Sequence, residues 1–139
     1  MARILVIDDE PVVREFVKEV LQLEGHRVET ANDGYAGLTA YRRQPADLAI
    51  VDLIMPYKDG IQTIEELRQL QPNLPIVVMT GAPPARWPIH MLYGHPAEMH
   101  ILAKPMTQEM LLDTMREALE SLAPESSSYQ PARETRAIE

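Results

Sequence analysis

The chain has 139 residues and a formal net charge of −8, and it contains no cysteine. This length suits one domain and leaves little room for a second. Without cysteine, disulfides and zinc–thiolate sites are excluded. The acidic charge argues against direct binding of nucleic acid, which needs clustered lysine and arginine. No apolar run approaches the roughly 20 residues that span a bilayer, so we expect a cytoplasmic protein that does not enter a membrane.

The first part of the chain alternates short strands with helices. Residues 3–8 form a β-branched run that predicts a buried strand. A helix is expected over residues 11–24, with apolar side chains at helical spacing, a proline in its first turn and a glycine after its end. Residues 27–31 predict a second strand. The turn at residues 32–34 leads into a second helix, which ends before Pro45.

The rest of the chain repeats this alternation. Residues 47–52 predict a third strand, residues 61–70 a helix and residues 75–80 a fourth strand. A fifth strand is expected over residues 100–103, and a last helix over residues 107–122 begins with a capping threonine. The apolar stripe of this last helix comprises Met110, Leu111, Met115, Ala118, Leu119 and Leu122.

Strands that are continuously apolar and alternate with helices predict an α/β fold with a doubly wound parallel sheet, because both faces of such a sheet are covered. We assign residues 1–122 to this domain. Residues 123–139 are rich in serine, proline and glutamate and predict a polar, flexible C-terminal tail. Ligands of such sheets bind outside the carboxyl ends of the strands, so a site is expected at that edge.

One segment interrupts the regular pattern. It contains Pro83, Pro84, Pro88 and Pro96. Because a proline inside a helix costs about 3 kcal/mol, a helix between the fourth and fifth strands is confined to about residues 89–93 and is short, irregular or absent. The large apolar side chains of this segment include those of Trp87, Met91, Leu92 and Tyr93. Two interpretations of them remain open: a surface for a partner, or a cover for the sheet.

Polar residues follow the predicted strands where each strand ends. Asp8 and Asp9 end the first strand, Asp52 ends the third, Thr80 ends the fourth and Lys104 follows the fifth. Clustered carboxylates repel one another, and a hard cation relieves this repulsion. Oxygen ligands of this kind favour Mg²⁺. The lysine and the threonine suit phosphoryl oxygens, and an aspartate can itself act as a nucleophile and form an acyl phosphate.

These residues stand in a fixed series of short motifs. The motifs are VIDDE at 6–10, VDLIMP at 51–56, DG at 59–60, MTG at 79–81 and AKP at 103–105. Together they resemble the receiver domains of two-component response regulators, such as chemotaxis regulators, over residues 1–122. The resemblance implies a flavodoxin-like sheet of five parallel strands in the order 2-1-3-4-5.

The resemblance also implies a Mg²⁺ site at the predicted edge. Asp9 would bind the cation directly, while Asp8 would act through a bound water or position the cation. Asp52 and the backbone carbonyl of Ile54 would be the remaining protein ligands.

The resemblance further implies a phosphoryl site. Asp52 would accept the phosphoryl group from a histidine kinase or a histidine phosphotransfer protein. Lys104 would pair with the phosphoryl oxygens, and Thr80 would donate a hydrogen bond to one of them. The peptide bond between Lys104 and Pro105 is expected to be cis.

Three positions depart from what is typical of the family. Ile54 and Ala82 occupy positions that tune the lifetime of the phosphoryl group, and neither side chain has a polar atom that could orient a water. We therefore expect slow self-dephosphorylation. Ile101 replaces the usual aromatic residue three positions before the lysine, so any switching is expected to proceed by loop rearrangement.

The sequence as a whole indicates a stand-alone receiver that regulates an unknown downstream protein, with no separate enzymatic turnover and with a homodimer possible. Two alternatives belong to other classes. One is a degenerate receiver that binds a partner without using phosphate. The other is an aspartyl-phosphate hydrolase, against which Ile54 argues because those enzymes need a second acid at that position.

Overall fold

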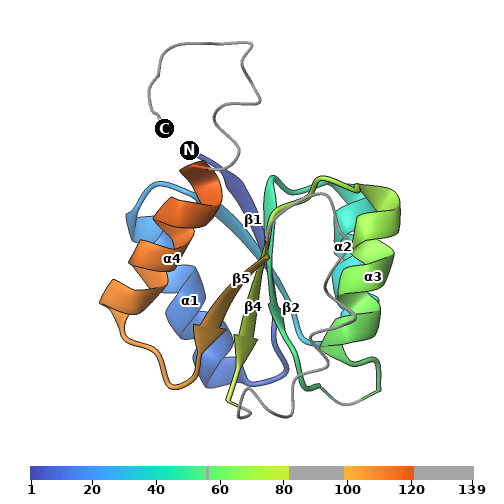
Figure 1. The fold of residues 1–139 in the computed structure, drawn as a ribbon, viewed down its shortest axis with the longest axis horizontal. Coiled ribbons are helices and arrows are strands. Elements are labelled where there is room, and N and C mark those ends of the chain that lie inside the picture. The colour runs from blue at the N-terminus through green and yellow to red at the C-terminus, as the bar shows by residue number, and fades with distance from the viewer. Residues whose placement is uncertain (56, 82–98, 121–139) are drawn as a thin grey trace.

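The computed structural model describes residues 1–55, 57–81 and 99–120 of the chain. Five parallel strands form one sheet in the order β2-β1-β3-β4-β5 (Figure 1). Their bounds are Arg3–Ile7 for β1, Arg27–Ala31 for β2, Leu48–Asp52 for β3, Ile76–Thr80 for β4 and Met99–Ala103 for β5. The predicted fold class and strand order are therefore confirmed.

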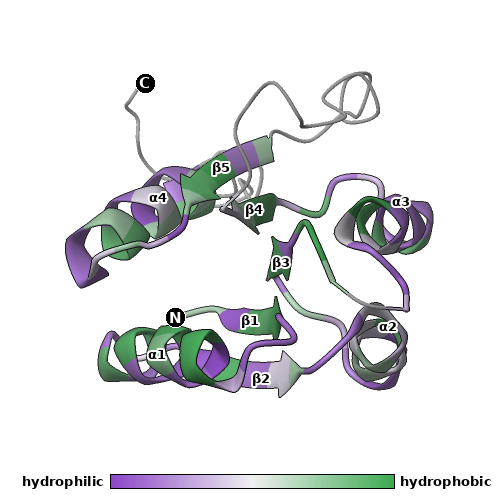
Figure 2. Cartoon of the chain, turned by 90° about the horizontal axis from the view of Figure 1, so that it is seen from below, coloured by the Kyte–Doolittle hydropathy of each residue, from purple (hydrophilic) through white to green (hydrophobic). Residues whose placement is uncertain are grey.

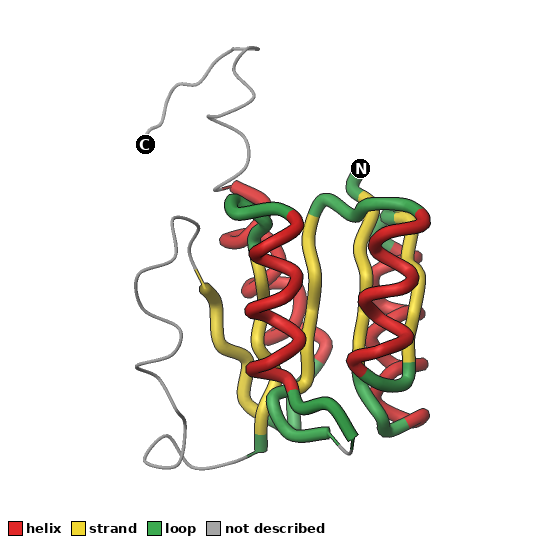
Figure 3. The backbone as a smooth tube through the Cα atoms, turned by 90° about the vertical axis from the view of Figure 1, so that its right-hand side faces the viewer, coloured by secondary structure: helices red, strands yellow, loops and turns green. Residues whose placement is uncertain are grey.

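The helices cover both faces of this sheet. Within the described residues they are α1 Pro11–Leu23, α2 Gly34–Arg43, α3 Gly60–Leu70 and α4 Gln108–Glu120. The helices α1 and α4 lie on one face, and α2 and α3 lie on the other (Figures 1 and 3). None of the helices in this part of the chain combines the length and the apolar character that a membrane span needs.

The core is split into two apolar layers by the sheet. Alternate side chains of the central strands enter opposite layers, as the pleat of a strand requires. One layer joins Leu5, Ile7, Ala49, Val51, Ile76 and Val78 to α2 and α3, and the other joins Ile4, Val6, Leu48, Ile50, Val77 and Met79 to α1 and α4. Figure 2 shows the apolar sides of the helices turned toward the sheet. The continuous apolar runs in the sequence reflect this burial on both faces.

The last helix was predicted correctly at its start and incorrectly at one position of its apolar stripe, while the predicted stripe residue Leu122 lies outside the described residues. The Thr107 hydroxyl oxygen accepts a hydrogen bond from the Met110 backbone N–H at 3.1 Å, so the expected cap is present. Leu111, Met115 and Ala118 are buried. Met110 is 39% exposed and does not belong to the buried side of α4.

Several predictions fall outside the described residues. They concern the proline-rich segment within residues 82–98, with its expected short helix and apolar side chains, and the tail at residues 123–139. These statements stay predictions.

Gly60, the first residue of α3, lies directly against the backbone that follows β3. A Cβ added there would lie 2.2 Å from the Asp52 backbone oxygen and 2.6 Å from the Leu53 Cα. Because these are backbone atoms, we expect Gly60→Ala to lower the free energy of unfolding by about 1–3 kcal/mol in urea titrations. Gly81→Ala is the control, since among the described residues its Cβ would meet only the Lys104 Cβ at 3.8 Å. Equal losses in both variants would contradict this explanation.

Candidate functional site

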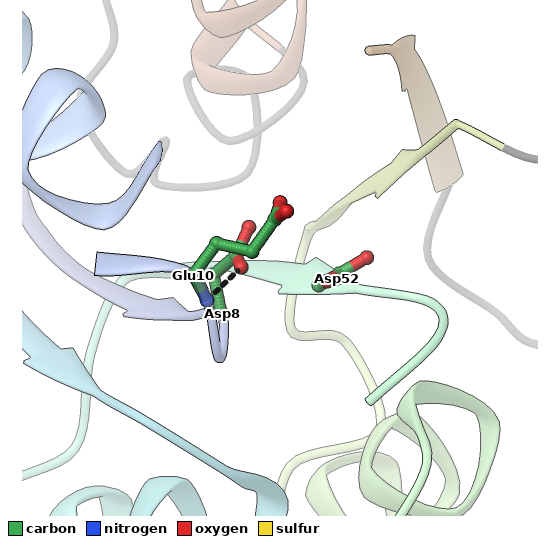
Figure 4. Close-up of side chains that lie close together, drawn as sticks. All are labelled: Asp8, Glu10 and Asp52. Atoms are coloured by element: carbon green, nitrogen blue, oxygen red, sulfur yellow. Dashed lines mark hydrogen bonds between the residues drawn. The ribbon is translucent and has the colours of Figure 1, made fainter. Parts of the chain in front are cut away.

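Charged side chains from the β1–α1 loop and from the end of β3 converge at the carboxyl edge of the sheet. Asp8 follows β1, Glu10 precedes α1 and Asp52 ends β3. Carboxylate oxygens of these three residues lie within 4.8 Å of one another, and Figure 4 shows the side chains beside each other. A cluster of oxygen donors this close together can hold a metal ion.

Lys104 provides the cation that faces this acidic cluster. Its Nζ lies 2.9 Å from Glu10 Oε1, 3.0 Å from Asp8 Oδ2 and 3.3 Å from Asp52 Oδ2. Burial acts to lower the pKa of Lys104, but the contacts with Glu10 and Asp8 and the charges of Asp52 and Asp8 outweigh it and raise that pKa above its usual value. The lysine is therefore a charged internal counter-ion for the carboxylates.

Asp8 is the most deeply buried member of the cluster, with 0% of its surface exposed. Its Oδ1 accepts a hydrogen bond from the Glu10 backbone N–H at 2.8 Å, and Arg14 Nη1 donates to its backbone oxygen at 2.8 Å. Its Oδ2 is buried and accepts no hydrogen bond from the described residues, although it forms the ion pair with Lys104. A buried carboxylate oxygen with free lone pairs suits a hard cation, so the residues present fit Mg²⁺.

Asp52 is 5% exposed, and its pKa is raised above the ordinary value for an aspartate. Burial, followed by repulsion from Asp8, raises the pKa of Asp52 to about 7, while Lys104 and the backbone N–H of Ile54 pull that pKa back down. The Ile54 N–H reaches Asp52 Oδ1 at 3.4 Å. In the metal-free protein the carboxyl group thus holds its proton into the neutral range.

This shift predicts a pH-dependent stability for the metal-free protein. Between its ordinary pKa of 3.8 and about 7, Asp52 is protonated in the folded state and ionised in the unfolded state. Its stabilising contribution is therefore complete below the lower value and is lost as the pH rises through the higher one. Asp52→Asn does not ionise, so its free energy of unfolding lacks this pH dependence. As the pH is raised from about 5 to about 8, we expect the variant to become more stable relative to the wild type by about 2–3 kcal/mol. Urea unfolding with a chelator at both pH values measures this gain, and a difference that stays constant would contradict it.

Most of the residues predicted for the site are brought together. Thr80 ends β4 and Lys104 directly follows the adjacent strand β5, and the Lys104 backbone N–H donates to the Thr80 carbonyl oxygen at 2.9 Å. Thr80 is 1% exposed. The peptide bond between Lys104 and Pro105 is cis, as expected. The Ile54 side chain is 63% exposed beside Asp52.

The acidic members of the site differ in part from the predicted set. Asp9 is partly exposed and is not among the three carboxylates whose oxygens converge. Glu10 takes part in the cluster instead and pairs with Lys104. In the sequence, Glu10 was visible only as the final residue of the VIDDE motif. That its side chain contacts Lys104 is seen only in the structure of the turn into α1. The direct role of Asp9 in binding a metal stays a prediction.

Comparison with known proteins agrees with this architecture. The family model for the response regulator receiver domain matches residues 4–116. The response regulator MprA of Mycobacterium sp. (strain KMS) is 33% identical over 130 residues, which cover 94% of this chain and 56% of that protein. The transcriptional regulatory protein GlrR of Escherichia coli K12 is 32% identical over 123 residues, which cover 88% of this chain and 27% of GlrR. The chain therefore spans only about half, or less, of the length of these relatives.

Solved structures show the same fold along nearly their whole length. The chemotaxis protein CheY4 of Vibrio cholerae is 30% identical with a TM-score of 0.77, covering 85% of this chain and 98% of CheY4. A CheY-like receiver domain protein of Methanospirillum hungatei is 27% identical with a TM-score of 0.81, covering 91% and 99%. Receiver domains of this kind are signalling modules rather than enzymes with independent turnover. The chain belongs to the response regulator receiver domains of two-component signalling.

Proposed function

We propose that this domain accepts a phosphoryl group on Asp52 in a Mg²⁺-dependent reaction, and that phosphorylation controls its binding to a partner protein. The observation that carries the proposal is the placement of Asp52. It is buried beside Asp8, at the carboxyl edge of a receiver fold, with the Lys104 ammonium 3.3 Å from its Oδ2. A nucleophile, a second acid and a cation thus meet where phosphoryl oxygens need neutralising charge.

Asp52, Lys104 and Thr80 have different roles in the proposed in-line phosphoryl transfer. An ionised oxygen of Asp52 attacks phosphorus, the bond to the donor breaks, and the donor departs with that bond's electron pair, which leaves an acyl phosphate on Asp52. Lys104 neutralises the phosphoryl oxygens, and the Thr80 hydroxyl donates a hydrogen bond to one of them. These roles depend on positioning and charge rather than on proton transfer by the protein.

A bound Mg²⁺ would supply further charge neutralisation and would favour the ionised form of Asp52. Asp8, Asp52 and the Ile54 carbonyl are the proposed protein groups that hold it. Asp9 is the fourth proposed member and would bind the cation directly.

The proposed donor is a histidine kinase or a histidine phosphotransfer protein, and the proposed reader of the phosphorylated state is another protein. The net charge of −8 supports a protein partner rather than nucleic acid for this domain. We take residues 1–122 as the receiver unit. One observation favours the phosphate-independent alternative: Ile101, in the place of the usual aromatic residue, is 41% exposed.

Incubation with acetyl phosphate and Mg²⁺ tests the proposal. Intact-mass spectrometry should show the gain of one phosphoryl group per chain, and the gain should be absent with a chelator and in the Asp52→Asn variant. Beryllofluoride with Mg²⁺ should bind the wild type with one equivalent. A chain that neither gains the group nor binds beryllofluoride would be the phosphate-independent binding module instead.

A further inference from the structure

Lys58 is a lysine with little exposed surface in the loop between β3 and α3. It is 9% exposed. Its aliphatic part lies over Gly34, the first residue of α2, where an added Cβ would be 3.0 Å from Lys58 Cδ and 3.1 Å from Cγ. Because withdrawing an ammonium group from water is costly unless the charge is paired, the partners of this lysine indicate what it does.

The Lys58 ammonium has partners on two different helices. Its Nζ lies 2.5 Å from Glu66 Oε2 on α3 and 4.9 Å from the centre of the Tyr35 ring on α2. The contact with Glu66 raises the pKa of Lys58, and the ring face attracts a cation at this distance. One side chain thus connects the loop to both helices on this face of the sheet.

The same loop carries the backbone that borders Asp52. The Ile54 N–H donates to Asp52 Oδ1, and the loop is closed at its base by the Gly60 N–H, which donates to the Leu53 carbonyl oxygen at 2.9 Å. Tyr57, directly before Lys58, has a φ of 67°. That left-handed conformation is unfavourable for a residue other than glycine and persists only where its surroundings hold it.

We propose that Lys58 is a positioning residue, which holds the loop of residues 53–55 and 57–59 through Glu66 and Tyr35 and so presents the Ile54 backbone to Asp52. The site and the α2–α3 face are coupled through this lysine. Lys58 is not proposed to touch the phosphoryl group, because its ammonium is engaged by α2 and α3. The effect on ligand affinity rests on the proposed function, whereas the effect on the loop does not.

The first experiment measures the loop in the metal-free protein. Lys58→Met removes the charge and keeps an unbranched side chain, Glu66→Gln removes the partner, and Lys58→Arg keeps the charge. Lys18→Met on α1 is the matched control for loss of one positive charge. Amide hydrogen exchange at residues 53–55 and 57–59 should rise about fivefold in Lys58→Met and Glu66→Gln. Exchange in β1 and β4 should not change, and the arginine variant and the control should resemble the wild type.

The second experiment measures Mg²⁺-dependent beryllofluoride affinity by calorimetry. The Kd should rise about fivefold in Lys58→Met and in Glu66→Gln. The double variant should be no weaker than either single variant, because both substitutions break one interaction.

Two results would overturn the proposal. One is a uniform rise in exchange throughout the fold. The other is a beryllofluoride Kd equal to that of the wild type in a Lys58→Met or Glu66→Gln variant that has lower thermal stability. Either result would mean that Lys58 only packs against its neighbours and does not position the loop. Failure of the wild type to bind beryllofluoride would overturn the proposed function and the affinity effect together. Loop exchange in the metal-free variants would still decide whether Lys58 positions the loop.

Discussion

Replacing Lys104 with methionine is expected to make the stability of this domain depend on Mg²⁺. The lysine ammonium lies within 3.3 Å of oxygens from Asp8, Glu10 and Asp52, two of which are buried residues. Methionine has a comparable unbranched shape, so the substitution removes the charge and leaves little cavity. Carboxylates without their counter-ion then repel one another in a poorly solvated site.

The expected loss in the metal-free protein is about 3 kcal/mol of unfolding free energy, which is the usual cost of leaving a buried charge unpaired. Lys104 lowers the pKa of Asp52, so its removal raises that pKa further above about 7. The measurement is therefore urea unfolding at about pH 9, because at lower pH Asp52 relieves the repulsion by taking up a proton. Adding Mg²⁺ should recover most of the loss, since a ligand that binds the folded state stabilises it in proportion to its affinity. Lys104 no longer competes for the carboxylates, so Mg²⁺ should bind the variant several-fold more tightly than the wild type.

Lys18→Met on α1 is the control, because it removes the same charge from outside the cluster. It should change stability by no more than about 0.5 kcal/mol, with or without Mg²⁺. A Lys104→Met variant as stable as this control in the absence of metal would show that the lysine does not balance the cluster. Weaker Mg²⁺ binding by Lys104→Met would show that the lysine assembles the metal site instead of competing for it.

The sequence predicted the sheet and the strand-end residues for the same physical reason. Strands buried on both faces are continuously apolar, and the direction of a parallel sheet places the residues after each strand at one edge. The placement of Asp8, Asp52, Thr80 and Lys104 at this edge could therefore be predicted without knowledge of any side-chain conformation.

Glu10 and Lys58 could not be found in this way. Glu10 joins the cluster because the turn into α1 directs its side chain back toward Lys104, which no periodic pattern encodes. Lys58 looks like an ordinary loop lysine, and its burial depends on Tyr35 and Glu66, which come from two other elements. Contacts that a long side chain makes with residues of other elements can be identified only from the folded structure.

Ile54→Asn is expected to shorten the lifetime of the phosphoryl group on Asp52 about tenfold. Hydrolysis requires a water aligned opposite the aspartyl oxygen, and an isoleucine side chain offers that water neither a donor nor an acceptor. One well-placed amide hydrogen bond contributes about 1–1.5 kcal/mol, which corresponds to about a tenfold change in rate. Because the Ile54 side chain is 63% exposed, the substitution leaves the core intact.

The lifetime is measured on protein that has been phosphorylated with acetyl phosphate and then freed of the donor, by following the decay of the phosphorylated mass. Ile54→Val is the matched control, because it changes the size of the side chain and adds no polar atom, and its decay should equal that of the wild type. If the asparagine variant also decays at the wild-type rate, water reaches phosphorus by a route that Ile54 does not border. Faster decay in both variants would assign the slow rate to the bulk of the isoleucine, because a smaller apolar side chain would then admit the water equally well.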